Sequence, residues 1–557
     1  MTYNDHKVMR KTSFIYGLTL LTLTLFGVSE KLSGQLSDDI VRGSWYKIQL
    51  PESGVYEITK EWLEDQLQID IASTPTTNVQ IYGIPRGILS ASSSYEDTER
   101  LVPLSTFVND GGDDRFDDGD DHILFYSSGQ DLITYDTQEQ RDEFTKNVYS
   151  STNYVFLRLG ENPDINHITT EETTARPDLV IDQYHFGSFL HNDQVNLLDD
   201  FISTQGSGQR WYGQELSNTG SFTFSTTDML PSGGLTDATV SAKLAGRSRQ
   251  REDVTLRVGS EEALRTFSAV NTSDIEALYA RDFEMQRTTE SLDASDDITI
   301  DFQKLDGDAR LWLDELAIHG LATISYDSDQ LVFNNIAALN SASPVGLNIS
   351  GGSNLTIWNI TDPRSIFSIN PLVTSDGLVI NSGTESVQRF VAFSDSDIKT
   401  PTNAGELSFR NIVEEGKVDL LIITPPLLSS VAEQLQEHRA THNGISSLIV
   451  SPEEIFDIYS SGRQDPSAIR NYIRDLYRTH AEFRYVLLLG DGSYDYRYIN
   501  QNYRNENLVP TYETINSLLI HCYLFLQMIF MLYSMMMKVP LLEVTSILPS
   551  EGYLSIL

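Results

Sequence analysis

The segment VDLLIITPP (residues 418–426) is a mainly apolar run, with LLII (420–423) at its centre, that ends in two prolines. Such a run is typical of a strand that is buried on both faces of a parallel sheet. Two similar runs follow it, ISSLIV (445–450) and YVLLL (485–489), and segments with helical spacing lie between them, at 427–444, 451–462 and 465–480. Strands that alternate with helices at this spacing predict a parallel α/β sheet with right-handed crossovers.

The third of these strands runs into the polar sequence GDGSYD (490–495). Ligands of parallel sheets bind beyond the carboxyl ends of the strands, so Asp491, Ser493 and Asp495 are candidate residues of a substrate cleft. The alternative is a hydrophilic turn that follows a core strand. A phosphate-binding loop is not indicated, because no Lys-Ser or Lys-Thr pair follows the glycines.

The chain upstream of residue 416 has a different pattern. Short alternating runs such as WYKIQL (45–50), GVYEIT (54–59) and HILFYSS (122–128) are typical of β-strands separated by turns. A chain of 557 residues exceeds what one hydrophobic core usually serves, so several domains are expected. We therefore predict an N-terminal β domain (35–181), a jelly-roll-like β-sandwich (182–334), a small β domain or spacer (335–415), an α/β domain (416–517) and an apolar tail (518–557).

The composition limits the expected partners. Asp and Glu number 79 against 39 Lys and Arg, which gives a formal net charge of −40. A surface this negative repels phosphate backbones, so nucleic acid is not an expected partner. Cys522 is the single cysteine, so neither an intramolecular disulfide nor a cysteine zinc site is expected.

The N-terminus has the pattern of a secretory signal peptide. Lys7, Arg10 and Lys11 precede a short apolar run (14–28) and small residues. This arrangement predicts export, with cleavage after Gly34. An uncleaved anchor is disfavoured because the run is short for a bilayer span.

One acidic loop is a candidate calcium site. NDGGDDRFDDGDDH (109–122) brings Asp110, Asp113, Asp117 and Asp120 together among glycines. Crowded carboxylate oxygens suit calcium, but the spacing is not that of an EF-hand. The alternative is an acidic loop that is merely solvated.

Arg210, Trp211 and Tyr212 form a second notable group, flanked by glycines. An exposed aromatic there would suit a sugar or a peptide. The alternative is an aromatic tucked under a β-sandwich, which is the commoner fate of a tryptophan.

The apolar tail LLIHCYLFLQMIFMLYSMMMKV (518–539) has no charged residue before Lys538. It is long enough to span a membrane, which is one interpretation. The other is a frameshift: adjacent ATG codons read from their third base give GAT, so MMMK (535–538) becomes Asp-Asp-Glu. Because the shifted frame restores the acidic composition, we interpret the tail as a wrong reading frame.

Several segments resemble gingipain-type cysteine peptidases, and within them the sortases of the type IX secretion system. They are VDLLIITPP, SSGRQDPSAIRNYIRDLY (460–477), YVLLLGDGSYDYR (485–497) and VPTYET (509–514). The resemblance implies a caspase-like α/β domain, here incomplete and preceded by β domains, and a cysteine nucleophile activated by a histidine. It also implies action at the outer membrane surface or in the periplasm of a Gram-negative bacterium. The implied partners are secreted proteins with C-terminal targeting domains and type IX secretion components, which would also supply any membrane association. It implies no cofactor.

The sequence departs from this family at the catalytic pair. It has no Gly-His-Gly, and its one His-Gly, His319-Gly320, lies in a predicted β-strand far from the α/β region. Cys522 and His521 both lie in the apolar tail, so the catalytic roles are not assigned to them. We therefore expect the chain to be inactive. The alternatives are a non-catalytic surface protein that binds secretion components and a calcium-dependent adhesin built on the Asp113 loop.

Overall fold

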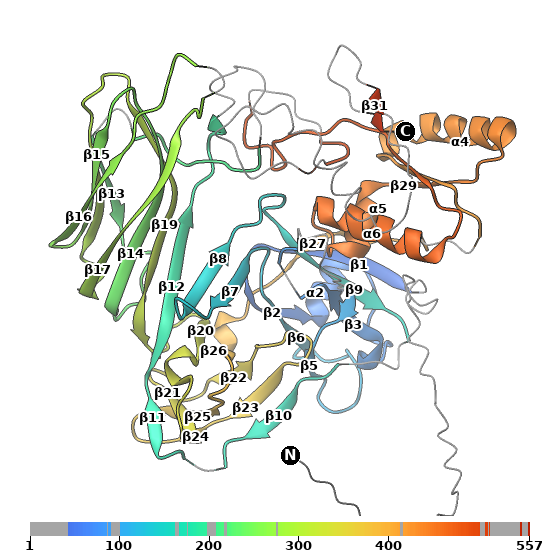
Figure 1. Ribbon diagram of the computed structural model, residues 1–557. Coiled ribbons are helices and arrows are strands. Elements are labelled where there is room, and N and C mark those ends of the chain that lie inside the picture. The colour runs from blue at the N-terminus through green and yellow to red at the C-terminus, as the bar shows by residue number, and fades with distance from the viewer. Residues whose placement is uncertain are drawn as a thin grey trace, which may run out of the picture.

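The computed structural model shows a mostly β protein with one group of helices near its C-terminal end (Figure 1). It describes residues 43–512, 546–547 and 555–556, apart from positions 86, 91–100, 162–165, 175, 198–207, 217–219, 275–276, 413–415, 502–506 and 511. The predicted signal peptide (1–34) and the apolar stretch 518–537 lie outside the described residues. Within these ranges, every helix is too short or too polar to cross a bilayer.

Two antiparallel sheets surround the first core of the molecule. Their orders are β27-β1-β9-β3-β4 and β2-β6-β5. The strands are β1 (Ser44–Leu50), β2 (Gly54–Thr59), β3 (Val79–Gly83), β4 (Val102–Pro103), β5 (Thr106–Asn109), β6 (His122–Ser127), β9 (Asn153–Leu159) and β27 (Thr402–Leu407). Ile48, Tyr56, Phe125 and Leu157 are fully buried between them. Helix α2 (Lys60–Leu67) covers one end, and Thr59 caps it by accepting a hydrogen bond from the Trp62 N–H.

One strand of the five-stranded sheet comes from far along the chain. β27 pairs with β1, so that Tyr46 lies opposite Glu406. Trp62 of α2 reinforces the pairing by donating its indole N–H to the Pro401 carbonyl at 3.0 Å. Strands from the ranges 35–181 and 335–415 therefore share one sheet.

The middle of the chain forms a β-sandwich of two four-stranded sheets, ordered β12-β19-β14-β17 and β13-β18-β15-β16. The strands are β12 (Gln183–His191), β13 (Ser221–Ser225), β14 (Leu235–Arg247), β15 (Glu252–Val258), β16 (Glu261–Phe267), β17 (Arg281–Leu292), β18 (Asp297–Gln303) and β19 (Arg310–Thr323). Val240, Leu244, Leu256 and Ile300 alternate inward from both sheets into one core. All pairings within these two sheets are antiparallel.

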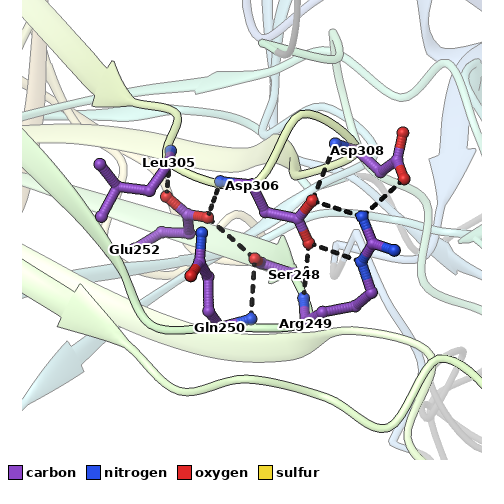
Figure 2. Close-up of polar contacts among 7 residues, drawn as sticks. All are labelled: Ser248, Arg249, Gln250, Glu252, Leu305, Asp306 and Asp308. Atoms are coloured by element: carbon purple, nitrogen blue, oxygen red, sulfur yellow. Dashed lines mark hydrogen bonds and ion pairs between the residues drawn. The ribbon is translucent and has the colours of Figure 1, made fainter.

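A buried carboxylate closes one end of this sandwich (Figure 2). Glu252 has no exposed surface and accepts hydrogen bonds from the Ser248 hydroxyl (2.9 Å), the Leu305 N–H (2.7 Å) and the Asp306 N–H (2.8 Å). Arg249 forms an adjacent pair with Asp306, at 2.7 and 2.9 Å, and its hydrogen bonds lower the pKa of Asp306. The β14–β15 turn is thus joined to the β18–β19 loop.

The Glu252→Gln variant should lower the free energy of unfolding by about 1–3 kcal/mol, because an amide replaces one acceptor oxygen with a donor that faces N–H groups. Denaturation in urea measures this loss. The control is Asp308→Asn in the same network, where the carboxylate is 82% exposed and should contribute little. Equal effects of the two variants would contradict the assignment of Glu252 as the buried organiser.

Two further sheets are ordered β10-β23-β22-β26-β20 and β11-β21-β25-β24. Both contribute to the core of the sandwich, and the first also packs on β2 and β6. Their strands are β10 (Thr169–Glu172), β11 (Leu179–Ile181), β20 (Leu331–Asn334), β21 (Val345–Ile349), β22 (Thr356–Asn359), β23 (Phe367–Asn370), β24 (Leu372–Val373), β25 (Leu378–Ser382) and β26 (Arg389–Phe393). Single 3₁₀ turns occur at Thr76–Asn78, Ile336–Ala338, Asp395–Asp397 and Pro426–Leu428. A short pair, β31 (Ser546–Ile547) and β32 (Ser555–Ile556), completes the described elements.

The hairpin of β7 (Leu132–Asp136) and β8 (Arg141–Thr145) packs on β12. Phe144 stacks on Phe189 with ring centroids 5.0 Å apart, and Asp142 accepts two hydrogen bonds from Arg389 of β26, at 2.6 and 2.8 Å. His319 of β19 packs edge-on against Phe189 at 5.2 Å. The histidine of the one His-Gly pair is therefore part of a sandwich strand, as the sequence indicated.

The pH dependence of stability should report on His319. Burial, and then the charge of Arg141, lower its pKa from 6.5 to about 4, although Asp142 and Glu315 act in the opposite direction. Because the folded-state pKa lies below the unfolded value, the unfolded chain binds the proton first, and stability is lost as the pH falls from 6.5 towards 4. At pH 5 the loss should be about 1–2 kcal/mol.

Urea denaturation of the protein at pH 7 and pH 5 measures this difference. The His319→Gln variant should show a smaller difference, and the remainder should come in part from His185, whose pKa burial also lowers. An unchanged pH dependence in the variant would contradict the assignment.

The predicted parallel strands are present as a three-stranded sheet ordered β29-β28-β30. Its elements are β28 (Leu420–Ile423), α4 (Ser429–Asn443), β29 (Ser447–Val450), α5 (Pro452–Tyr459), α6 (Pro466–Thr479) and β30 (Tyr485–Leu488). Gly444 ends α4 with a φ of 66°, a left-handed conformation that glycine adopts without strain. Ser451 and Glu454 form a capping box at the start of α5.

This α/β unit shares a core with the N-terminal sheet. Leu421 and Ile423 of β28 pack on α5 and α6. The same hydrophobic cluster contains Trp45 of β1, Phe156 of β9 and Phe409, which lies between β27 and β28 in the sequence. The other face of the parallel sheet packs on α4 through a smaller cluster around Ala432. Helices α5 and α6 thus lie in one hydrophobic core with two different sheets.

Candidate functional site

The carboxyl ends of the three parallel strands meet as predicted. Thr424, directly after β28, donates its N–H to the Val450 carbonyl at 3.0 Å and its hydroxyl to the Leu489 carbonyl at 2.9 Å. One threonine therefore ties together the ends of all three strands. The GDGSYD loop leaves the sheet at this point.

The three predicted cleft residues lie in this loop but differ in accessibility. Asp491 is exposed, and its carboxylate accepts a hydrogen bond from the Gly492 N–H at 3.0 Å. Asp495 is fully buried and accepts from the N–H groups of Ile499 (2.9 Å) and Asn500 (2.8 Å). The Ser493 hydroxyl accepts from the Asp495 N–H at 3.1 Å. Asp495 therefore organises the loop, while Asp491 is the member of the set that faces solvent.

The sequence did not predict that this loop docks on the β domains. Tyr494 stacks on Trp211 with centroids 5.9 Å apart, and Tyr496 packs edge-on against Tyr149 at 4.8 Å. The Gln209 side chain donates to the Tyr149 hydroxyl at 2.7 Å. The alternating tyrosines of SYDYRY were the available signal, since large aromatic side chains in a turn need partners to cover them.

An ion-pair group holds the end of the same loop. Asp193 contacts Arg497, and Lys146 lies 3.0 Å from the same Asp193 oxygen. The Arg497 and Asp193 side chains are each only 9% exposed, so the pair is shielded from solvent. The β domains thus fix the loop at the carboxyl edge of the parallel sheet through both aromatic and ionic contacts.

The structure supports the second interpretation of the group Arg210, Trp211 and Tyr212, in which the aromatic side chains are buried against the β-sandwich. Trp211 is 4% exposed and Tyr212 is fully buried. Arg210 bridges two acids, at 2.7 Å to Asp282 and 3.1 Å to Asp314, and the Tyr212 hydroxyl donates to Asp282 at 2.9 Å. An exposed sugar-binding face is therefore not formed by these aromatics.

The four predicted calcium ligands occupy one loop without converging. The carboxylate of Asp110 accepts from the Thr76 hydroxyl (2.9 Å) and from the Gly112 N–H (3.0 Å), and that of Asp113 accepts from the Arg115 N–H (3.0 Å). Asp117 and Asp120 accept hydrogen bonds through their main-chain carbonyls. Among the described residues, no three acidic, histidine or cysteine side chains are arranged to hold a metal ion.

The comparisons with known proteins agree with the family resemblance. Residues 413–554 match the model of peptidase family C25, the gingipain family. The match begins just before β28 and extends through the apolar stretch. No curated protein matches the sequence.

One solved structure extends the similarity to the fold of most of the chain. Dimeric latent PorU from Porphyromonas gingivalis is similar with a TM-score of 0.70 and 20% sequence identity, over 86% of this chain and 44% of that one. The chain therefore spans less than half the length of PorU. Two carbohydrate-binding modules, from a Ruminococcus flavefaciens family 9 glycoside hydrolase and from a xylanase of the Trinervitermes trinervoides hindgut metagenome, match at a TM-score of 0.15 and 11% identity. Each covers 24% of this chain and nearly all of the module (98% and 97%), and likeness this low carries no argument.

Proposed function

We propose that this protein derives from gingipain-like cysteine peptidases of the PorU type, which process the C-terminal signals of type IX secreted proteins at the outer membrane surface, and that it lacks their catalytic histidine and cysteine. The observation that carries the proposal is the C25 match over residues 413–554, which begins at the parallel sheet of a PorU-like fold. The sheet order β29-β28-β30, with α4 on one face and α5 and α6 on the other, supports a caspase-like arrangement.

The chemistry of such an enzyme needs a cysteine thiolate and a histidine that activates it and protonates the leaving group. The carboxyl edge where Thr424 and Asp491 lie is the edge at which parallel sheets bind ligands. In this sequence the cysteine is Cys522, outside the described residues, and Gly-His-Gly does not occur. We therefore propose that the chain as printed has no peptidase activity.

An activity assay tests this part of the proposal. Purified residues 35–557 should not cleave peptide substrates, with or without reducing agent. Cleavage that disappears in the Cys522→Ala variant would refute the inactive state and would identify the nucleophile.

Sequencing the gene across codons 518–522 tests the reading frame. We expect an insertion or deletion relative to close relatives, and a shifted frame that encodes Gly-His-Gly followed by a cysteine at a strand end. An intact frame would remove the frameshift interpretation and leave the apolar stretch 518–537 as a native segment.

The second candidate is a non-catalytic surface protein that binds secretion components. The observation in its favour is that Ser493 and Asp495 are used inside their own loop and do not face a cleft. The DNA downstream of codon 522, read in the shifted frame, distinguishes the two functions. A gene that descends from an enzyme should encode the Gly-His-Gly and cysteine motifs there. In both cases we propose an exported protein whose partners carry C-terminal targeting domains.

A further inference from the structure

A cavity of about 500 Å³ lies along the outer edge of β29. One wall is the N-terminal half of α4, with Glu433 and Gln436. Arg410 and Glu454 of α5 also line the cavity, together with Ser447, Leu448 and Ile449 of β29. We call this cavity the β29 groove. A groove between a helix and an edge strand is the geometry in which extended peptides add to sheets.

The main-chain groups of β29 alternate between the sheet and the groove. The Val450 carbonyl accepts from the Thr424 N–H at 3.0 Å, so the even-numbered positions of β29 face β28. Because successive residues of a strand point their main-chain groups to opposite sides, those of Ser447 and Ile449 face the groove.

Side chains already occupy the two carbonyls that face the groove. Gln436 donates to the Ser447 carbonyl at 2.6 Å, and Arg410 donates to the Ile449 carbonyl at 2.9 Å. Each carbonyl has a second lone pair, so these contacts do not exhaust its capacity to accept. They hold the edge strand in place and stop it from pairing indiscriminately.

The main-chain N–H groups of the same two residues, Ser447 and Ile449, remain available to donate hydrogen bonds to a ligand. The N–H groups of Ser447 and Ile449 donate to no residue in the described part of the chain. The Ser447 hydroxyl is also buried there without a partner. Two donors that are two residues apart on a strand lie roughly 6.6 Å from each other, which is the repeat of carbonyls along an extended peptide.

The charges of the groove select the side chains of its occupant. Arg410 and Glu454 neutralise each other through hydrogen bonds of 2.8 and 3.1 Å. Glu433 lines the groove, is exposed and has no ion pair among the described residues. An occupant with a lysine or arginine side chain beside Glu433 would complement this charge.

We propose that the β29 groove binds an extended basic peptide as an added strand. The peptide's carbonyls accept from the N–H groups of Ser447 and Ile449, and a lysine or arginine pairs with Glu433. The occupant is a segment of a partner protein. The groove adjoins the carboxyl edge of the sheet, because Thr424 and Pro426 also line it. The proposal does not depend on peptidase activity.

The test uses the full chain and the labelled synthetic peptide acetyl-Thr-Lys-Val-Lys-Val-Thr-amide, with fluorescence anisotropy as the readout. Glu433→Lys should weaken binding at least tenfold. The matched control is Glu437→Lys, one turn further along α4 and outside the lining, which should change binding less than twofold. Bound peptide should also slow hydrogen exchange of the Ser447 and Ile449 amides.

Four results would overturn the proposal. They are no binding at millimolar peptide, equal binding of the peptide with both lysines replaced by glutamate, binding without protection of the two amides, and self-association of the chain that Glu433→Lys abolishes. The last result would assign the groove to a second copy of the protein.

Discussion

The Trp45→Ala variant should lose about 3–5 kcal/mol of stability, because it leaves a large cavity in a core that two parts of the molecule share. Trp45 is fully buried, and its ring lies 4.6 Å from Phe409 and 5.1 Å from Tyr82, each in an edge-on arrangement. The cavity therefore opens between the N-terminal sheet and the helices of the α/β unit. Chemical denaturation measures the loss.

Hydrogen exchange measures which parts of the Trp45→Ala variant lose stability. If the two parts share one core, amides of β1 and amides of β28 should both lose protection in the variant. The control is Phe107→Ala, an aromatic truncation on β5 at a side chain that is 40% exposed, which should cost less than about 1 kcal/mol. Loss of protection confined to β1 would show that the α/β unit folds on its own.

The Asp495→Ala variant should lose roughly 2–4 kcal/mol, because it removes a buried acceptor and leaves two N–H groups unpaired. Those groups belong to Ile499 and Asn500, at 2.9 and 2.8 Å from the carboxylate. The docked tyrosines Tyr494 and Tyr496 should loosen with the loop, so the amides of residues 494–500 should exchange faster. The measurement is urea denaturation combined with hydrogen exchange.

Asp491→Ala is the matched control for Asp495→Ala, since both residues lie in GDGSYD and differ in burial. Asp491 is exposed, so its replacement should change stability by less than about 0.5 kcal/mol. A ligand that binds at the carboxyl edge should instead respond to Asp491→Ala. The opposite pattern, a stable Asp495→Ala protein with impaired ligand binding, would restore Asp495 as a cleft residue.

Local sequence patterns predicted the parallel sheet well. The mainly apolar runs in 418–426, 445–450 and 485–489 contain β28, β29 and β30, because strands buried on both faces need a largely apolar sequence. The family resemblance drawn from the same segments is confirmed by the C25 match and the PorU-like fold. The signal peptide and the frameshift stay predictions.

Patterns of the same kind could not predict contacts between distant segments. The alternation in 45–50 shows that β1 has a buried face, but not that its neighbour is β27. In the same way, an aspartate in a polar turn is expected to be exposed, whereas Asp495 is fully buried in a loop that docks on the β domains. Topology thus predicted that the GDGSYD loop follows the carboxyl ends of the strands, whereas the burial of each side chain depended on tertiary packing, and the substrate cleft stays a prediction.

The pairing of β1 with β27 also sets the order in which the molecule can assemble. A chain that emerges from its N-terminus presents residues 44–50 long before residues 402–407 arrive, so one side of β1 has no partner from its own sheet during that interval. An unpaired strand edge invites association with other chains, and pairing across so long a separation is slow. The first sheet to be made is thus among the last to be finished, and one edge of β1 stays open to other chains until β27 has been made.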